Sequence, residues 1–416
     1  MLSKVVFGLL VCLVLITPIP YGTVEPWWKA AFICAVFGVC ILAVVEIAIS
    51  NSIRFNSWPV LLPLLALAAL AFVQSWTRIS ADVFETRFVS FQLLALTVFV
   101  GLLYQYAATP DRMRVLIFVI IGMAVVSAIF GTLRQTTQHQ IGFVLPLLKP
   151  SQGFAQFINK NHFAFLMEMA FGLGVGLVIG ERSRQGWIYL AFLPPLWVGL
   201  VLSNSRGGIL AMLVQVVIAA LLLTKRLALR VALATALVAG VLLGTLWVGG
   251  DRLLSNFEHA SSEVAVDAST AGEGASRNEI WRATLKLFAA HPVLGAGLGG
   301  YWIAITAYHD APGTLTPQEA HNDYLELLAS GGVIGFALGV WFVVSVVRLA
   351  QKNLWSSTGS LRAVRIGAIL GLAGVAVHSL VDFGLHLTGN AVVFLVLIML
   401  ATATIQSRSS REKLLT

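Results

Sequence analysis

Hydrophobic and polar positions follow one another along this chain in long blocks, not at every second residue. The apolar blocks are each long enough to cross about 30 Å of hydrocarbon as a helix, and short polar stretches separate them. The blocks cover residues 4–20, 30–49, 58–74, 88–107, 113–133, 162–180, 186–203, 207–224, 230–248, 322–347, 363–381 and 389–406. The pattern predicts an all-α polytopic membrane protein with about twelve transmembrane helices. It lacks the alternating segments of about 10 residues that are typical of outer-membrane barrels.

The first apolar block is also compatible with a signal peptide, since Lys4 precedes it. No cleavage site of small residues precedes Tyr21, so we expect the block to be the first helix of the protein. The sequence therefore predicts a single integral membrane domain over residues 1–416. Two longer polar stretches interrupt it, a large loop at 249–320 and a smaller one at 134–161.

Composition and charge agree with this interpretation. The chain is 58% hydrophobic and 11% charged, whereas soluble domains are about 25% charged. If both termini are cytoplasmic, the clustered basic residues, such as Arg112, Arg114 and Arg365, fall in inner loops as the positive-inside rule requires. The net charge of +8 is then explained by topology, and we expect no nucleic-acid partner. The same topology puts both longer loops on the outer, periplasmic face and predicts that any active site faces outward.

The large loop contains its own helical signals. Residues 276–279, "SRNE", fit a capping box, and apolar residues then recur at helical spacing until Pro292, which predicts an amphipathic helix on the outer surface. Residues 316–319, "TPQE", repeat the capping pattern. They predict that the next helix begins at about Pro317, with His321 one turn inside it.

Two arginines on the predicted outer side are candidate anion ligands. Arg277 at a helix N-terminus combines a bidentate guanidinium with the positive end of the helix dipole, although an ion pair with Glu279 or Glu273 is the alternative. Arg206, in "NSRGG", is either a second anion ligand or a lipid headgroup anchor.

His321 is the natural general acid or base, because imidazole titrates near neutral pH and the membrane edge is accessible to a sugar hydroxyl. The alternative is an interfacial hydrogen-bonding role. Asn322, Asp323 and Glu326 either orient His321 or cap the helix. Lys160 and His162 are candidate phosphate or headgroup contacts, with snorkelling as the alternative reading of both.

Other patterns in the sequence give weaker evidence for a functional site. His378, Asp382 and His386 have the spacing of a metal stripe on one helix, but Gly384 and a helix end near Asp382 argue against it. The three cysteines have no metal-like spacing. "GAGLGG" (295–300) follows a helix and no strand, so it is not a dinucleotide loop. Gly331, Gly335 and Gly339 predict close helix packing. We expect no metal site and no cofactor.

Three motifs occur in an order that is typical of one protein superfamily. "NSRGG", "SRNEIWRATLKLFAAHPVLGAGLGGY" and "EAHNDYLELLASGGVIG" resemble the O-antigen ligase and polymerase superfamily of bacterial inner membranes. The ligase pattern of His, then Asn, nine residues and G-x-x-G is met by His321, Asn322, Gly332 and Gly335. Where ligases often continue with two threonines, this chain has Phe336 and Ala337. The resemblance covers mainly residues 150–390.

The resemblance implies a GT-C-like, metal-independent inverting glycosyltransferase that uses an undecaprenyl-diphosphate-linked glycan as donor on the periplasmic face. It implies that Arg206 and Arg277 bind the donor diphosphate and that His321 activates a hydroxyl of the acceptor, lipid A–core in a ligase. Membrane lipids are the remaining expected partners. Candidates for supporting roles are Asn322, Lys160, His162, Arg282 and Asp382.

Two alternatives stay open at this point. A polymerase or a protein O-oligosaccharyltransferase of the same superfamily would use the same donor with another acceptor. A secondary transporter, with Glu46 and Glu168 as coupling residues, would also fit about twelve helices. No inverted repeat or pair of broken helices supports the transporter.

Overall fold

A computed structural model of the chain describes residues 1–53, 57–137, 153–180, 185–223, 228–244, 277–309 and 317–405. Every apolar block predicted from the sequence is helical in it. These helices are α1 (Leu2–Ile16), α2 (Pro26–Ser50), α3 (Trp58–Trp76), α4 (Val83–Tyr106), α5 (Pro110–Thr137), α6 (Lys160–Gly180), α7 (Gln185–Leu202), α8 (Arg206–Leu223), Ala228–Gly244, α12 (Asp323–Trp355), α13 (Gly359–His378) and α14 (Thr388–Thr402).

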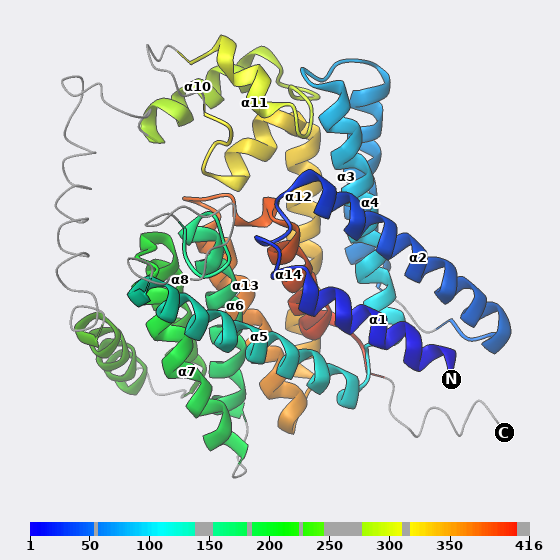
Figure 1. The fold of residues 1–416 in the computed structure, drawn as a ribbon. Helices are drawn as coiled ribbons and strands as arrows, with labels where there is room; N and C mark the ends of the chain where they lie inside the picture. Colours follow the sequence, from blue (N-terminus) through cyan, green and yellow to red (C-terminus); the bar gives the residue numbers. More distant parts are fainter. Residues whose placement is uncertain are drawn as a thin grey trace, which may run out of the picture.

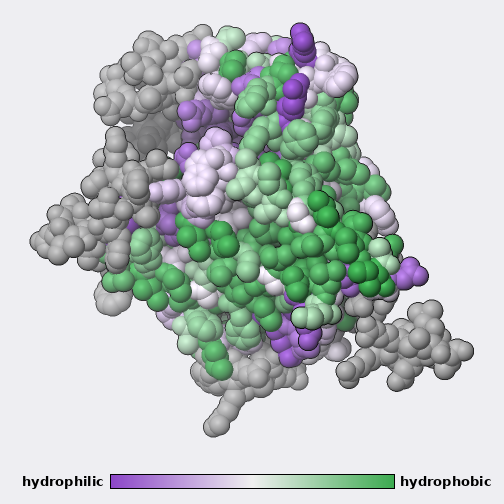
Figure 2. Space-filling model, turned by 45° about the vertical axis from the view of Figure 1, so that its right-hand side comes forward, coloured by the Kyte–Doolittle hydropathy of each residue, from purple (hydrophilic) through white to green (hydrophobic). Residues whose placement is uncertain are grey.

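Seven of these helices are long and apolar enough to cross a membrane by length and composition, and five further apolar helices are shorter. The prediction of a helical, polytopic membrane protein is therefore confirmed, while the number of crossings remains a prediction. Among the described residues the only β pairing is an isolated bridge between Phe154 and Phe157. Figure 2 shows a broad hydrophobic surface across the middle of the molecule, with hydrophilic residues above and below it.

One end of the helical bundle joins the first and the last helix. Arg112, at the start of α5, contacts the Ser3 hydroxyl of α1 at 3.2 Å. The hydroxyls of Tyr104 in α4 and Thr402 in α14 lie 2.6 Å apart, and Arg365 of α13 donates to the Ala403 carbonyl. Because α12 ends and α13 begins here, the start of α12 and the end of α13 lie at the opposite end (Figure 1).

Helices α6 and α13 form the closest helix pair of the bundle. A side chain added at Gly172 or Gly176 of α6 would collide with the backbone of Gly371 or Gly367 of α13. Small residues at such a contact let the two backbones approach closely. The pair fixes the N-terminus of α6, residues 160–162, beside the C-terminal end of α13 and the turn that follows it.

Helix α12 is broken at Gly332. This residue has φ 64° and ψ −167°, a region that is essentially reserved for glycine. The backbone groups freed by the break find partners in the segment after α10: the Val333 N–H donates to the Pro292 carbonyl at 2.8 Å, and the Ser330 carbonyl accepts from the Gly297 N–H at 3.0 Å. The "GAGLGG" segment is therefore a packing element that fills the break in α12.

The predicted roles of the α12 glycines need a correction. Gly331 and Gly335 contact Leu70 of α3, as close packing predicts, but the nearest neighbour of Gly339 is Leu327 of α12 itself. The glycine with a strict conformational requirement is Gly332, which the four-residue spacing skips. Sequence spacing could not show the break, because the partners of the broken helix come from a separate segment.

The predicted amphipathic helix is present as α10 (Arg277–Ala290), and Ser276 lies outside the described residues. Its apolar face packs against other parts of the protein. Ala283 and Leu287 pack against Tyr301 and Ile305, of α11 (Tyr301–Ala304) and η1 (Ile305–Ala307), and against Ala329 of α12. These helices form a cap at the top of Figure 1.

Replacement of Gly332 by alanine tests the break. The side chain would enter a glycine-only backbone region and collide with the Val293 carbonyl, so we expect Gly332→Ala to lower the free energy of unfolding by about 1–3 kcal/mol. Gly38→Ala is the matched control, because no atom lies within 4 Å of its new methyl group. Thermal unfolding of both variants in detergent measures the difference, and equal stability would contradict the role of Gly332.

Candidate functional site

The site is organised around a buried carboxylate, Asp382, whose side chain is 1% exposed. Its Oδ1 lies 3.6 Å from Nδ1 of His321 and accepts the backbone N–H of Phe383 at 2.9 Å. Its Oδ2 lies 4.0 Å from a guanidinium nitrogen of Arg277 and accepts a short hydrogen bond from the Asn161 amide. Arg277 and His321, both predicted from the sequence as site residues, therefore both lie next to Asp382. The sequence had indicated Asp382 only as a supporting candidate.

The end of α13 explains why Asp382 points into the site. The helix stops at His378, and the amides of Val381 and Asp382 turn back to the His378 carbonyl. His386 follows in the separate short helix η2 (Gly384–His386). The three residues thus do not share one helix face, and the metal stripe considered from their spacing does not form.

The segment before α12 corrects a second prediction. The helix begins at Asp323 with Asn322 as its N-cap, not at about Pro317, and Thr316 lies outside the described residues. Asn322 accepts the N–H groups of Tyr324 and Leu325. The signal was available, since Asn is among the strongest N-cap residues and Asp323 follows it.

Asn322 also positions His321. Its amide donates to the Leu380 carbonyl at 2.9 Å, and the N–H of Asp323 donates to the Ser379 carbonyl at 3.0 Å. These bonds join the start of α12 to the turn that carries Asp382. His321 lies just outside the helix with φ 50°, so it is held between two anchored neighbours.

Phe383 is a site residue that sequence reasoning missed. Its ring packs edge-on against the imidazoles of His321 at 4.9 Å, His162 at 4.8 Å and His386 at 5.9 Å. The side chain of His321 is 33% exposed, yet its Nδ1 is buried. The accessible part of the ring therefore faces away from Asp382. No pattern in the sequence marks one phenylalanine among many as the common neighbour of three histidines.

Arg206 and Lys160 extend the positive charge around Arg277. Lys160, exposed at the first position of α6, interacts electrostatically with both Arg206 and Arg277. Arg206 is the first residue of α8, and a side chain at the next position, Gly207, would collide with the His378 ring. Three cations from α6, α8 and α10 thus gather near the turn after α13.

The remaining supporting candidates have different surroundings. His162 is 6% exposed and packs against Phe383, so its side chain is not placed for the predicted headgroup contact. Arg282 is exposed on α10 and is not among the described contacts of Asp382. Arg277, whose side chain is 42% exposed, pairs with Asp382 and retains an accessible face.

The surroundings of Asp382 keep it ionised. Burial raises the pKa of this carboxyl, but its interactions with His321 and His162 and the hydrogen bond from the Phe383 amide outweigh burial and hold the pKa at about 2. Asp382 is therefore a fixed negative charge beside the imidazole of His321 and the guanidinium of Arg277.

Among the described residues, one group has the composition and spacing of a metal site. It consists of Glu319, Glu326 and His386, whose ligand atoms lie within 4.8 Å of one another. Phe383 lies between this group and His321, because its ring contacts both His321 and His386.

Fold and site together define a helical membrane protein with a cationic site next to a histidine–aspartate pair. Residues 190–340 match the family described as O-Antigen ligase, which confirms the resemblance over this span. Arg206, Arg277 and His321 lie inside the matched span, whereas Lys160 and Asp382 lie outside it. A search of curated proteins finds no match.

The two residues that the transporter interpretation assigns to coupling both have partners inside the protein. Glu168 pairs with His378 at 2.9 Å, with both side chains fully buried. Glu46 accepts a hydrogen bond of 2.7 Å from the Tyr106 hydroxyl.

Asp382→Asn tests the fixed charge. A carboxyl whose pKa is lowered by folding stabilises the protein above its unfolded pKa of about 3.9, and this contribution is lost as pH falls through about 2. We expect Asp382→Asn to lower the free energy of unfolding at pH 7 by about 2 kcal/mol, and the difference from wild type to narrow below pH 4. Denaturation in detergent across this pH range measures it.

Asp111→Asn is the control, because Asp111 pairs with Arg114 at 3.8 Å on the surface and its side chain is 94% exposed. Such a pair contributes little to stability. A pH-independent difference between Asp382→Asn and wild type would show that the Asp382 charge is not responsible.

Proposed function

We propose that the protein is an O-antigen ligase-like, inverting glycosyltransferase. It moves a polysaccharide from undecaprenyl diphosphate to a sugar hydroxyl of lipid A–core, on the periplasmic face of a bacterial inner membrane. The observation that carries the proposal is the meeting of Arg277 and His321 at Asp382. The O-antigen ligase match over residues 190–340 supports it.

The cations form the donor half of the proposed site. Arg277, Arg206 and Lys160 belong to three different helices, and both arginines lie within electrostatic range of Lys160. A diphosphate carries charge that grows as the bond between its oxygen and the anomeric carbon breaks. Guanidinium groups held in place beforehand stabilise that charge and donate paired hydrogen bonds to the phosphate oxygens. They do the work of a divalent ion, so no metal takes part in the transfer step.

His321 forms the acceptor half. Its buried Nδ1 faces Asp382, so its other nitrogen, Nε2, is the one that an acceptor hydroxyl reaches. The acceptor oxygen attacks the anomeric carbon, its proton passes to Nε2, and the lipid diphosphate leaves as an anion. Asp382 holds the ring and stabilises the imidazolium that forms, as the carboxylate of a catalytic triad does. Attack opposite the leaving group inverts the anomeric centre.

The orientation of the protein follows from the same proposal. The proposed site lies at the end of the bundle where α12 begins and α13 ends, opposite the start of α1 and the end of α14. Arg112 and Arg365, predicted to be cytoplasmic, lie at that opposite end. Cytoplasmic termini therefore put the site on the periplasmic face.

A polymerase of the superfamily remains the second candidate, because Phe336 and Ala337 replace the two threonines common in ligases. A protein O-oligosaccharyltransferase would use the same site chemistry. Lipopolysaccharide from a deletion strain separates these functions. Loss of a ligase leaves lipid A–core without long polysaccharide, and loss of a polymerase leaves a single repeat unit attached. An unchanged lipopolysaccharide would favour protein glycosylation.

His321→Ala tests the base. In proteoliposomes with purified lipid-linked donor and lipid A–core acceptor, we expect the rate of transfer to fall about 10²–10⁴-fold, the range for loss of general acid–base catalysis. His291→Ala is the control, since His291 is an exposed histidine after α10. Transfer by His321→Ala at the wild-type rate would rule out His321 as the base.

Arg277→Lys tests the donor half. Lysine keeps the charge but replaces the planar fork with a single ammonium group, so we expect at least a 10-fold loss of kcat/KM for the donor. Arg114→Lys, at the opposite end of the bundle, should leave transfer unchanged. The same assay measures both variants, and a normal rate with Arg277→Lys would argue against bidentate diphosphate binding.

A further inference from the structure

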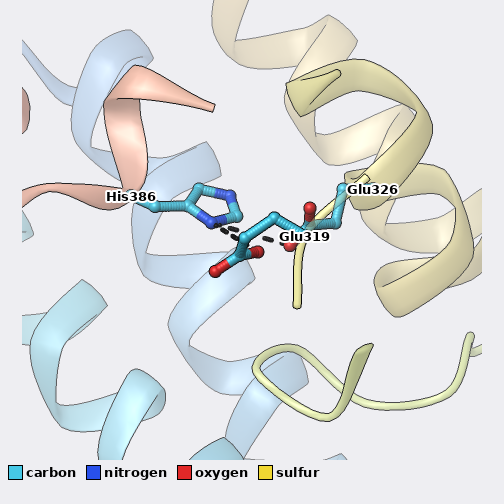
Figure 3. Close-up of side chains that lie close together, drawn as sticks. All are labelled: Glu319, Glu326 and His386. Carbon is cyan, nitrogen blue, oxygen red and sulfur yellow. Dashed lines mark ion pairs between the residues drawn. The ribbon is translucent and has the colours of Figure 1, made fainter. Parts of the chain in front are cut away.

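A second polar cluster lies next to the proposed site and takes no part in the transfer chemistry described above. Figure 3 shows Glu319, Glu326 and His386 pointing toward one another from the segment before α12, from α12 and from η2. Nδ1 of His386 lies 3.2 Å from Glu319 Oε2 and 3.6 Å from Glu326 Oε1. Three segments of the chain thus direct one nitrogen and two carboxylates to one point.

The two nitrogens of the His386 ring have different partners. Nδ1 faces Glu319 and Glu326, while Nε2 lies 3.5 Å from Oδ1 of Asp323. In metal sites, a ligating histidine almost always donates its other ring N–H to a carboxylate or a carbonyl, which fixes the tautomer. Asp323 has the position of the carboxylate that accepts this N–H from Nε2. The lone pair of Nδ1 is then directed at Glu319 and Glu326.

The cluster carries more negative than positive charge. The side chain of Glu326 is 8% exposed, and its Oε2 accepts the Ala320 N–H at 2.8 Å. Both carboxylate oxygens of Asp323 are buried. Three carboxylates surround the one imidazole of His386, which pairs with all three when it is protonated. A divalent ion in place of that proton would compensate more of the carboxylate charge.

We propose that Glu319, Glu326 and Nδ1 of His386 bind one divalent metal ion of the Zn²⁺ class, with Asp323 orienting His386. One imidazole and two carboxylates form a mixed nitrogen and oxygen ligand set. Such a set suits Zn²⁺, whereas Mg²⁺ and Ca²⁺ prefer ligand sets made of oxygen atoms alone. Tetrahedral bonds of about 2.1 Å separate ligand atoms by roughly 3.4 Å. Ligand atoms within 4.8 Å of one another therefore need to approach by at most about 1.4 Å.

The ion would have a structural role. Glu319 lies two residues before His321, and His386 lies four residues after Asp382, so the ion would tie together the two segments that carry the histidine–aspartate pair. The ring of Phe383 packs between the imidazoles of His321 and His386. The site differs from the metal stripe considered from the sequence, because His386 joins Glu319 and Glu326 and not His378 and Asp382.

Metal binding by the full-length protein in nanodiscs tests the proposal without any transferase assay. After treatment with a chelator and dialysis, titration with Zn²⁺ should give one bound ion per chain by elemental analysis. It should also raise the thermal unfolding midpoint, as any ligand of the native state does. His386→Gln and Glu319→Gln should abolish this binding, and His291→Gln should retain it. Mg²⁺ and Ca²⁺ at equal concentration should not replace Zn²⁺.

Asp323→Asn provides the decisive variant. A residue that only orients the ligand should leave the stoichiometry at one ion and weaken the affinity about 10–100-fold. Gel filtration identifies variants that fail to fold, and if His386→Gln is one of them, Asp323→Asn and Glu326→Gln decide the question. Absence of stoichiometric Zn²⁺, or equal Zn²⁺ binding by wild type and every folded cluster variant, would overturn the proposal. Either result leaves the transferase proposal untouched.

Discussion

The architecture of the site depends on the burial of one ionised carboxylate. Removing a carboxylate from water costs several kcal/mol unless charges and hydrogen bonds compensate it. Asp382 is compensated from three separate parts of the chain: the Asn161 amide in α6, His321 before α12 and Arg277 in α10. Because each of these groups stabilises the same charge, the carboxylate is a common polar contact for three segments of the chain.

The apolar scaffold makes that meeting possible. The glycine contact between α6 and α13 fixes the two helices relative to each other, so that Asn161 and Asp382 lie side by side. The break at Gly332 opens α12 to the segment after α10, so α10 and the first turns of α12 pack as one unit. Arg277 and His321 therefore approach Asp382 together. Trp281 of α10 strengthens this link by donating to the Ala320 carbonyl at 3.0 Å.

Local signals in the sequence predicted the parts and missed their junctions. Every apolar block became a helix, and α10 begins at Arg277, because hydropathy and helical spacing act within one segment. The central place of Asp382 could not be predicted, since its partners Asn161 and Arg277 lie far away in the sequence. The start of α12 was assigned too early because "TPQE" matches a capping pattern in the sequence, whereas the actual N-cap, Asn322, also bonds to Leu380 of a distant turn.

The ionisation of Asp382 also determines where a proton goes in the proposed reaction. With its pKa held at about 2, Asp382 is a carboxylate at neutral pH. It therefore cannot take the proton onward from His321, and its charge favours the imidazolium. The same charge faces Arg277, whose exposed side lies toward the proposed diphosphate. The fixed anion thus supports both halves of the site: it keeps the proton on His321 and fixes the orientation of the guanidinium opposite the leaving group.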